Sequence, residues 1–399
     1  MRIGWTLATY MFLVVGTFGF LQPFVPLYLE SSGLDRREIG FVLGIATGLA
    51  LLVQPALGRW SDRADRRRPF VVAASAAAGT AYLCYPLADG LFGLLLLSAV
   101  GANATLYLNA AGGVIVGRLV ASEQGGAAYA GYRVFGSIGY ICTTLLTGSL
   151  LLLGYGPRAD LSREELNVVF YLAPLLFFVV AGLAFWLPDP HAQSDRGTGP
   201  RSGVRAPWTP NLVWFLVAFT IYTMALYGAS AFLSVYMKQL GANALWITGT
   251  FAAGVVCEVL VMRQSGRLAD QYGRRPLLMV AFLLLPVRLA LYALVASPGG
   301  VLLVQLLHGL NFGIMGAVAV AFVNDMATDQ TRGQLQGRLA AAGGAATAVA
   351  PVGLGIVAEL NGLPAMFLVA AAVAALAAVL FSAFVKESLT RPGTAHASP

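Results

Sequence analysis

Twelve long apolar stretches recur along the chain, and they constrain its fold more than any other feature. A helix needs about 20 residues to cross the ~30 Å hydrocarbon layer of a bilayer. Only 11% of the residues are charged, whereas a soluble domain has roughly 25%. We therefore expect an all-α membrane protein with 12 transmembrane helices. The expected spans lie near residues 4–29, 38–60, 69–88, 90–117, 127–153, 167–187, 211–237, 244–265, 275–296, 300–325, 334–359 and 364–385.

Arg and Lys residues gather in alternate breaks between these spans. Positively charged loops are retained in the cytoplasm, whereas acidic residues contribute little to orientation. With the N-terminus inside, eighteen of the 25 Arg and Lys residues fall on the cytoplasmic side, and only Arg36, Arg37, Arg158, Arg163 and Lys238 fall outside. We expect a multi-pass protein of the cell inner (plasma) membrane with both termini cytoplasmic. The net charge of +7 then reflects topology and not binding to nucleic acid.

An internal repeat divides the spans into two groups of six. The segment GRWSDRADRRRP beginning at Gly58 returns as GRLADQYGRRP beginning at Gly266, with the shared pattern GRxxDxxxRR displaced by 208 residues. Residues 188–210 contain five Pro and form the longest break. We predict two pseudo-symmetric six-helix bundles, 1–187 and 211–386, joined by a cytoplasmic linker, 188–210, and followed by a tail, 387–399. Such repeats place a substrate site at mid-membrane between them.

Signs of catalysis or metal binding do not appear in the sequence. No HExxH, GxSxG or P-loop pattern occurs, and Cys84, Cys142 and Cys257 stand alone without CxxC spacing. Two of the three His residues fall in the predicted linker and tail. We therefore expect no enzymatic activity, no cofactor and no metal site, and we expect the linker and tail to be too short for the output domain of a sensor.

The repeated loops resemble the signature loop of the major facilitator superfamily, which lies between the second and third spans of a half. The resemblance covers essentially the whole chain and implies the major facilitator fold. It also implies that acidic and basic residues of the loops steady one conformation at the cytoplasmic face. The residues implied in this conformational gating are Gly58, Asp62, Arg66 and Arg67, with Gly266, Asp270, Arg274 and Arg275 in the second copy.

Several further stretches are similar to the group that contains lactose permease and the phenylpropionate and nucleoside proton symporters. They are PFVPLYL at 23–29, QPALGRWSD at 54–62, YRVFGSIG at 132–139, CEVLVM at 257–262, PVRLALYAL at 286–294 and QLLHGLNF at 305–312. The GPxxGG-like run of drug/proton antiporters is missing from the fifth span. The fourth span, ATLYLNAAGGVIVG at 104–117, lacks the carboxylate that lactose permease has there.

Four ionisable residues fall within the predicted spans: Arg133, Glu258, Arg288 and His308. Such residues cost roughly 2.5–3.5 kcal/mol at a helix centre, so they are candidates for function. The resemblance implies that Glu258, Arg288 and His308 couple the proton to the substrate, with Glu258 as proton carrier. The alternatives are an Arg133 that reaches the cytoplasmic surface, a static pair of Glu258 and Arg288, and an ordinary hydrogen-bonded His308.

Polar residues at helical spacing predict the lining of a substrate cavity. A polar face within a bilayer turns toward other helices or a water-filled cavity. The seventh span has such a stripe, and Gln305 and Asn311 share a face with His308. The predicted lining residues are Arg133, Tyr107, Asn109, Thr223, Tyr227, Ser230, Gln305 and Asn311.

Two Arg and one Glu leave this site with a net charge of +1 when His308 is neutral, which favours an anionic substrate. We predict a monomeric, proton-coupled symporter of a small organic solute, plausibly an aromatic carboxylate, that works by alternating access in the lipid bilayer. The first alternative is symport of a neutral sugar or nucleoside, with Arg133 paired to Glu258. The second is proton-driven efflux of a drug or metabolite.

Overall fold

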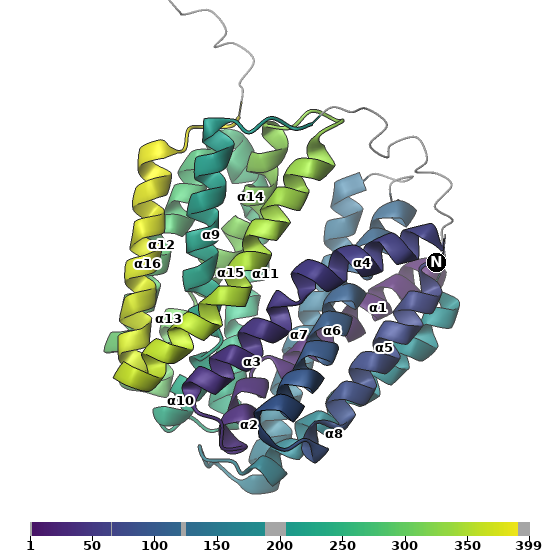
Figure 1. Cartoon of the computed structure of the whole chain (residues 1–399), viewed down its shortest axis with the longest axis vertical. Helices are drawn as coiled ribbons and strands as arrows, with labels where there is room; N and C mark the ends of the chain where they lie inside the picture. The colour runs from purple at the N-terminus through teal and green to yellow at the C-terminus, as the bar shows by residue number, and fades with distance from the viewer. Residues whose placement is uncertain (1, 65, 121–124, 188–204, 390–399) are drawn as a thin grey trace, which may run out of the picture.

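The computed structural model describes residues 2–64, 66–120, 125–187 and 205–389, and these residues form a bundle of long helices (Figure 1). The described helices are α1 (Arg2–Leu21), α2 (Val25–Ser31), α3 (Arg36–Gly48), α4 (Ala50–Arg63), α5 (Arg68–Leu83), η1 (Tyr85–Leu87), α6 (Gly90–Val120), α7 (Gly125–Tyr155), α8 (Arg163–Leu183), η2 (Ala184–Trp186), α9 (Pro210–Ser230), α10 (Leu233–Gln239), α11 (Ala244–Tyr272), α12 (Arg274–Leu294), α13 (Pro298–Gln305), α14 (His308–Asp325), α15 (Arg332–Asn361) and α16 (Leu363–Phe384). In the described part they make 12 segments long and apolar enough to cross a membrane, which confirms the all-α fold.

Four of these segments are interrupted helices. The first span consists of α1 and α2, the second of α3 and α4, the seventh of α9 and α10, and the tenth of α13 and α14. Pro23 and Pro26 explain the first interruption, because a proline lacks the N–H that a continuous helix needs. The second interruption is slight, because the backbone N–H of Leu49 still bonds to the carbonyl of Ile45 and that of Val53 to the carbonyl of Leu49.

The internal repeat is visible in the turns as well as in the loops. Gly33 and Gly241, 208 residues apart, have φ angles of +86° and +85°, the left-handed region that favours glycine. Two residues later in each copy, Asp35 accepts a hydrogen bond from the backbone of α3 and Asn243 accepts one from the backbone of α11. Side-chain oxygens at this position stabilise a helix start. The two halves therefore begin their second spans in the same way.

The two bundles lie side by side, the first drawn in purple to blue and the second in green to yellow (Figure 1). Most of the predicted linker, 188–204, and of the predicted tail, 390–399, lies outside the described residues. The division at 1–187 and 211–386 therefore stays a prediction in its detail. Pro210, which we had assigned to the linker, begins α9.

The halves pack together toward the end of the bundle that carries the turns at Gly33 and Gly241. We call this the closed end. There α3 packs along α15 and α7 along α11. A Cβ on Gly40 would overlap the carbonyl of Pro351, and one on Gly148 would overlap the side chain of Thr248. We call the opposite end, with the GRxxDxxxRR loops and residues 205–209, the linker end. Beyond the kink of the second span, α4 contacts α15 much less than α3 does.

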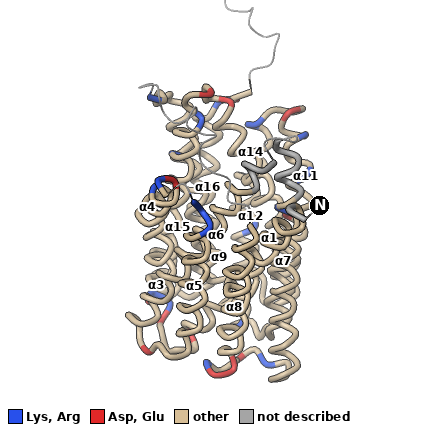
Figure 2. The backbone as a smooth tube through the Cα atoms, turned by 90° about the vertical axis from the view of Figure 1, so that its right-hand side faces the viewer, with Lys and Arg blue, Asp and Glu red and all other residues tan. Residues whose placement is uncertain are grey.

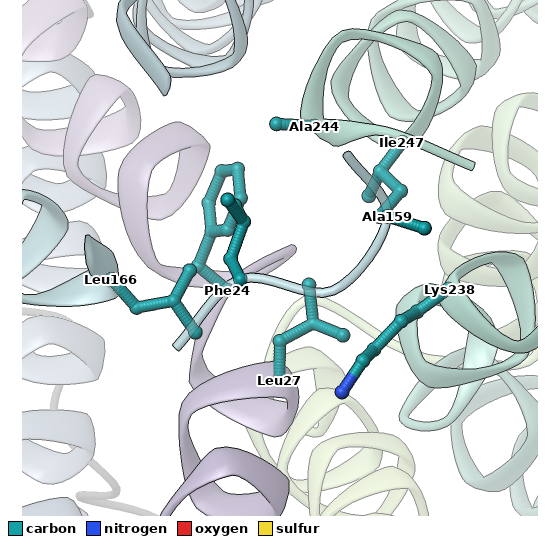
Figure 3. A pocket seen from close by; sticks show the side chains of 8 residues that line it. Phe24, Leu27, Ala159, Leu166, Lys238, Ala244 and Ile247 are labelled. Atoms are coloured by element: carbon teal, nitrogen blue, oxygen red, sulfur yellow. The ribbon is translucent and has the colours of Figure 1, made fainter. Parts of the chain in front are cut away.

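Ion pairs join the halves at the closed end. Lys238 of α10 extends past a small apolar pocket to the other half (Figure 3). Its Nζ lies 3.1 Å from a carboxylate oxygen of Glu30 and 2.9 Å from one of Asp160. On another helix pair, the backbone N–H of Arg36 donates to Glu359 at 3.0 Å. We call the group Glu30, Asp160 and Lys238 the closed-end clasp.

Glycine at position 139 is required for the close approach of α1 and α7. A Cβ there would overlap the backbone of Phe12 in α1. Replacing Gly139 by Val should therefore force the helices apart and lower the stability by about 1–3 kcal/mol. Gly154, in the same helix, has open space around it, so Gly154→Ala is the matched control. Thermal unfolding in detergent measures both variants, and equal midpoints would contradict this account of the α1–α7 contact.

Candidate functional site

Charged residues fall mostly near the ends of the helices, so those within the spans stand out (Figure 2). Glu258 lies in α11, Arg288 in α12 and His308 at the start of α14. These three predicted residues come together in one cluster within the second half. Arg133 lies in α7 of the first half.

Arg288 is buried, with 1% of its surface exposed. Its guanidinium donates to Tyr292 Oη at 3.1 Å, to Gln305 Oε1 at 2.9 Å and to Asn311 Oδ1 at 3.4 Å, and its Nη2 lies 3.2 Å from His308 Nδ1. None of these partners is a carboxylate. The cation is therefore held by dipoles, and its nearest compensating charge lies beyond His308.

The contact with Arg288 determines where His308 carries its proton. A guanidinium group has only donors, so His308 Nδ1 must accept the hydrogen bond and the imidazole must be neutral with its proton on Nε2. Nε2 lies 3.6 Å from Glu258 Oε2, which is close but beyond a normal hydrogen bond. His308 thus separates Glu258 from Arg288, and the alternative of a direct static pair does not describe this arrangement.

The interruption of the tenth span presents these side chains. Gln305 ends α13 and His308 begins α14. The backbone N–H groups of Leu306 and Leu307 bond to carbonyls three residues earlier, at 3.2 and 3.1 Å, so the chain turns more tightly than an α-helix here. Discontinuous helices are common at the substrate and ion sites of transporters.

A glycine brings α14 against α11. A Cβ on Gly309 would lie 2.6 Å from Cβ of Cys257 and 2.7 Å from the backbone nitrogen of Glu258, closer than side chains normally pack. The two helix backbones can approach this closely because Gly309 has no side chain. This contact places Glu258 opposite His308.

Two of the predicted lining residues are enclosed in the packing around Arg288. Gln305 is 2% exposed and Asn311 is fully buried. Asn311 also donates from Nδ2 to the carbonyl of Ala281 at 3.0 Å. In this conformation these amides orient Arg288. Tyr292, which sequence reasoning missed, does the same, and its position four residues after Arg288 on one helix face was the available signal.

The polar stripe on α9 meets the cluster through an aromatic contact. Tyr227, 43% exposed, lies edge-on to Phe312 at 5.4 Å between ring centroids, and Phe312 stacks on the His308 imidazole at 4.1 Å. Thr223 is buried, and Ser230 donates to a carbonyl of its own helix at 2.7 Å. Tyr227 is therefore the most exposed of the three predicted α9 residues. Phe312 was missed, because an aromatic residue in a span usually contacts lipid or core.

Arg133 is exposed and, among the described residues, has no hydrogen-bond or ion-pair partner. Arg133 in α7 and Glu258 in α11 lie on helices that pack together, and no ion pair joins the two residues within the described part. In α6, Asn109 is exposed, whereas Tyr107 is buried at 4% exposure. The first half thus contributes a cation that no acidic side chain of the described residues pairs with.

The first GRxxDxxxRR loop closes on its own half. Asp62 accepts a hydrogen bond from Arg67. Arg68 donates at 2.7 Å to the carbonyl of Leu187, the residue that follows the sixth span. Arg66 is exposed and makes no hydrogen bond or ion pair with a described residue. A Cβ on Gly58 would meet open space, so this conformation does not require a glycine there.

The second loop has the same arrangement with one addition. Asp270 pairs with Arg274, which also lies 3.1 Å from Asp325 in α14, and Arg275 donates at 2.6 Å to the carbonyl of the residue that follows the twelfth span. Open space surrounds Gly266 as well. The loop therefore ties four spans of the second half together at the linker end.

These contacts pair Arg67 with Arg274 and Arg68 with Arg275 as equivalent residues. Counting from the shared Asp instead pairs Arg66 with Arg274. The first loop is one residue longer before its proline. Aligning the loops on Pro69 and Pro276 therefore identifies Arg68 as the equivalent of Arg275. That register was visible in the sequence and was missed.

Twelve spans in two related halves, with a charged cluster enclosed between helices, define a secondary transporter. The family described as "MFS_1 like family" matches residues 4–369. The chain therefore belongs to the major facilitator superfamily, and it is a multi-pass membrane transporter.

Known relatives agree with this assignment. An uncharacterized MFS-type transporter of Mycobacterium tuberculosis is 26% identical over 329 residues, covering 77% of this chain and 74% of the relative. A putative sugar efflux transporter of Deinococcus radiodurans is 25% identical over 314 residues, covering 76% and 78%. The crystal structure of a mutant of the nucleoside transporter NupG matches with a TM-score of 0.81 at 16% identity, covering 96% of this chain and 100% of that one. At that identity the last match shows the fold alone.

Proposed function

We propose that the protein is a proton-coupled symporter of a small organic anion that works by alternating access. The observation that carries this proposal is the series Arg288, His308 and Glu258, with Arg133 on the facing half, where no described residue pairs with it. The two Arg and one Glu sum to +1. An anion that binds between the halves would supply the missing charge.

Glu258 is the proton carrier in this proposal. His308 cannot take a proton on Nδ1 without losing the hydrogen bond from Arg288. Glu258 faces no such constraint, and its side chain is 20% exposed. Protonation of Glu258 would raise the charge of the site from +1 to +2 and so strengthen the binding of an anion. Proton and anion then bind cooperatively, which is the thermodynamic requirement for symport.

The proposed orientation follows the excess of Arg and Lys at the linker end. With that end in the cytoplasm, the closed end faces outward, and both termini are cytoplasmic in the plasma membrane. The packing of α3 on α15 and of α7 on α11 at the closed end supports an inward-facing conformation. We further propose that the transporter functions as a monomer.

The pH response of the closed-end clasp provides a check on this assignment. The hydrogen bond from Lys238 lowers the pKa of Asp160 from its ordinary value of 3.8. The stabilisation from this pair is therefore complete above pH ~4 and is lost as the pH falls through the lowered pKa. We expect the difference in melting temperature between the wild type and Asp160→Asn to stay constant from pH 5.5 to 8 and to vanish in stronger acid.

Thermal unfolding across that pH range is the measurement, with Asp329→Asn at the exposed Arg332 pair as the control. A difference that changed between pH 5.5 and 8 would contradict the expectation. If it holds, a dependence of transport on pH near neutrality does not arise at Asp160.

A second candidate is transport of a sugar or nucleoside. A relative named as a putative sugar efflux transporter favours a sugar, and the contact between Tyr227 and Phe312 offers aromatic surface to a sugar or nucleobase ring. The name of this relative also favours export over uptake. The direction of solute movement under an imposed proton gradient separates export from uptake.

A ligand screen followed by flux measurement tests the proposal. We expect aromatic carboxylates to raise the melting temperature of the purified protein, whereas the corresponding amides should not, because only the carboxylate compensates the Arg charge. A carboxylate that binds should then drive proton entry into proteoliposomes. Stabilisation by sugars or nucleosides alone would refute the anion proposal in favour of the second candidate.

A further inference from the structure

An apolar groove of about 320 Å³ lies between α9 and α15 at the linker end. Its volume is within the range of small-ligand sites. Val213, Leu216 and Val217 line one wall, and Ala341 and Ala342 line the other. Val213 and Val217 are each 38% exposed, so the groove is open.

The groove continues the face of α15 that joins the two halves at the closed end. Ala341 and Ala348 are seven residues apart and share a helix face. Ala348 packs against Gly44 and Gly48 of the second span. At the level of Ala341 the second span has continued as α4, which contacts α15 far less. An apolar strip that is covered by protein at one end is therefore uncovered at the other.

A cation without a counter-charge stands at the mouth of the groove. The guanidinium of Arg338 lies 3.8 Å from the ring centre of Trp208 and donates to the carbonyls of Ala206 and Pro207 at 2.6 and 3.1 Å. All three contacts are neutral, and no ion pair engages Arg338 among the described residues. Arg205, exposed, adds a second positive charge in the adjoining segment.

We propose that this groove binds one anionic phospholipid from the leaflet at the linker end, with an acyl chain along Val213 and Val217 and the phosphate on Arg338. Tryptophan and arginine are typical of the headgroup level of a bilayer, and basic pockets between the ends of spans bind anionic headgroups. A lipid here would cover Ala341, on the face of α15 against which the second span packs at the closed end. It should therefore favour the conformation with an open linker end.

Native mass spectrometry of protein from micelles with equal phosphatidylglycerol and phosphatidylcholine tests the proposal. We expect the wild type to retain phosphatidylglycerol about fivefold over phosphatidylcholine, the ratio for roughly 1 kcal/mol per arginine near a membrane surface. Arg338→Gln should abolish the preference. Val217→Trp should reduce retention of both lipids by filling the groove. Val213→Phe fills it less and replaces Val217→Trp if that variant does not fold.

Arg332→Gln is the matched control, because Arg332 is an exposed arginine at the start of the same helix and lies outside the groove. It should bind lipid like the wild type. An equal loss in Arg332→Gln and Arg338→Gln would show general surface attraction and overturn the proposal. So would a wild type without preference. Retention of glycerol phosphate equal to that of phosphatidylglycerol would also overturn the proposal, because the site would then bind a free anion.

Discussion

Replacement of Glu258 by Gln should abolish uphill accumulation of substrate while exchange across the membrane continues. The amide keeps the size and hydrogen-bonding capacity of the carboxyl group but cannot release a proton. The carrier would then move between its two conformations only with substrate bound, and a proton gradient could no longer perform work on it. Net uptake of substrate, including uptake driven by an imposed pH gradient, should be lost, whereas counterflow of labelled substrate should stay within about threefold of the wild type.

The matched control is Glu359→Gln, which removes a carboxylate from a span at the closed end, away from the cluster. It should accumulate substrate. Two results would refute the assignment of Glu258: accumulation by Glu258→Gln against a gradient, or a loss of counterflow as complete as the loss of accumulation. The second result would place Glu258 in substrate binding and leave the proton carrier unassigned.

Replacement of Arg288 by Lys should have the second largest effect. The guanidinium makes four polar contacts in one plane, and the ammonium of Lys cannot reach all of them. Buried amide and hydroxyl groups would lose their partners, at a cost of about 2 kcal/mol in stability. If the same groups orient the cationic site that binds the substrate, the rate of transport should fall roughly 30-fold.

The substitution should also release His308. The Lys ammonium reaches fewer acceptors than the guanidinium, so His308 Nδ1 can lose its donor and become free to take a proton. The pH profile of the residual exchange should then gain a step that the wild type lacks. Arg267→Lys, the same change at an exposed position of α11, is the control and should leave stability and transport unchanged. A wild-type pH profile in Arg288→Lys would show that Arg288 does not control the protonation of His308.

Hydropathy predicted the spans and the repeated loops predicted the two halves, because both signals can be read directly from the sequence. The interruption of the tenth span could not be predicted in this way. No glycine or proline marks the break between Gln305 and His308, since that break depends on contacts with other helices. Glu258, Arg288 and His308 were identifiable because a charge is rare in a span. Their sequence could not show that His308 lies between the other two, because this arrangement depends on the approach of α11 to α14 at Gly309.

The lining residues illustrate a further limit. Periodicity grouped Gln305 and Asn311 with His308, and all three do contact Arg288. Periodicity cannot distinguish an amide that orients a buried cation from one that meets a substrate, because both lie on an inward face. Tyr292 and Phe312 had no polar pattern to mark them. In the gating loops, the choice between Arg66 and Arg68 required the register of the two copies, which an insertion of one residue obscures.

The closed-end clasp also bears on how two such halves can assemble. Glu30 and Lys238 are 208 residues apart and so occupy the same position in the two copies, yet they contact each other across the interface. Two identical copies joined about a twofold axis would place like charges there and repel. The opposite charges thus discriminate between partners. Separately expressed halves should pair with each other, whereas two first halves or two second halves should not.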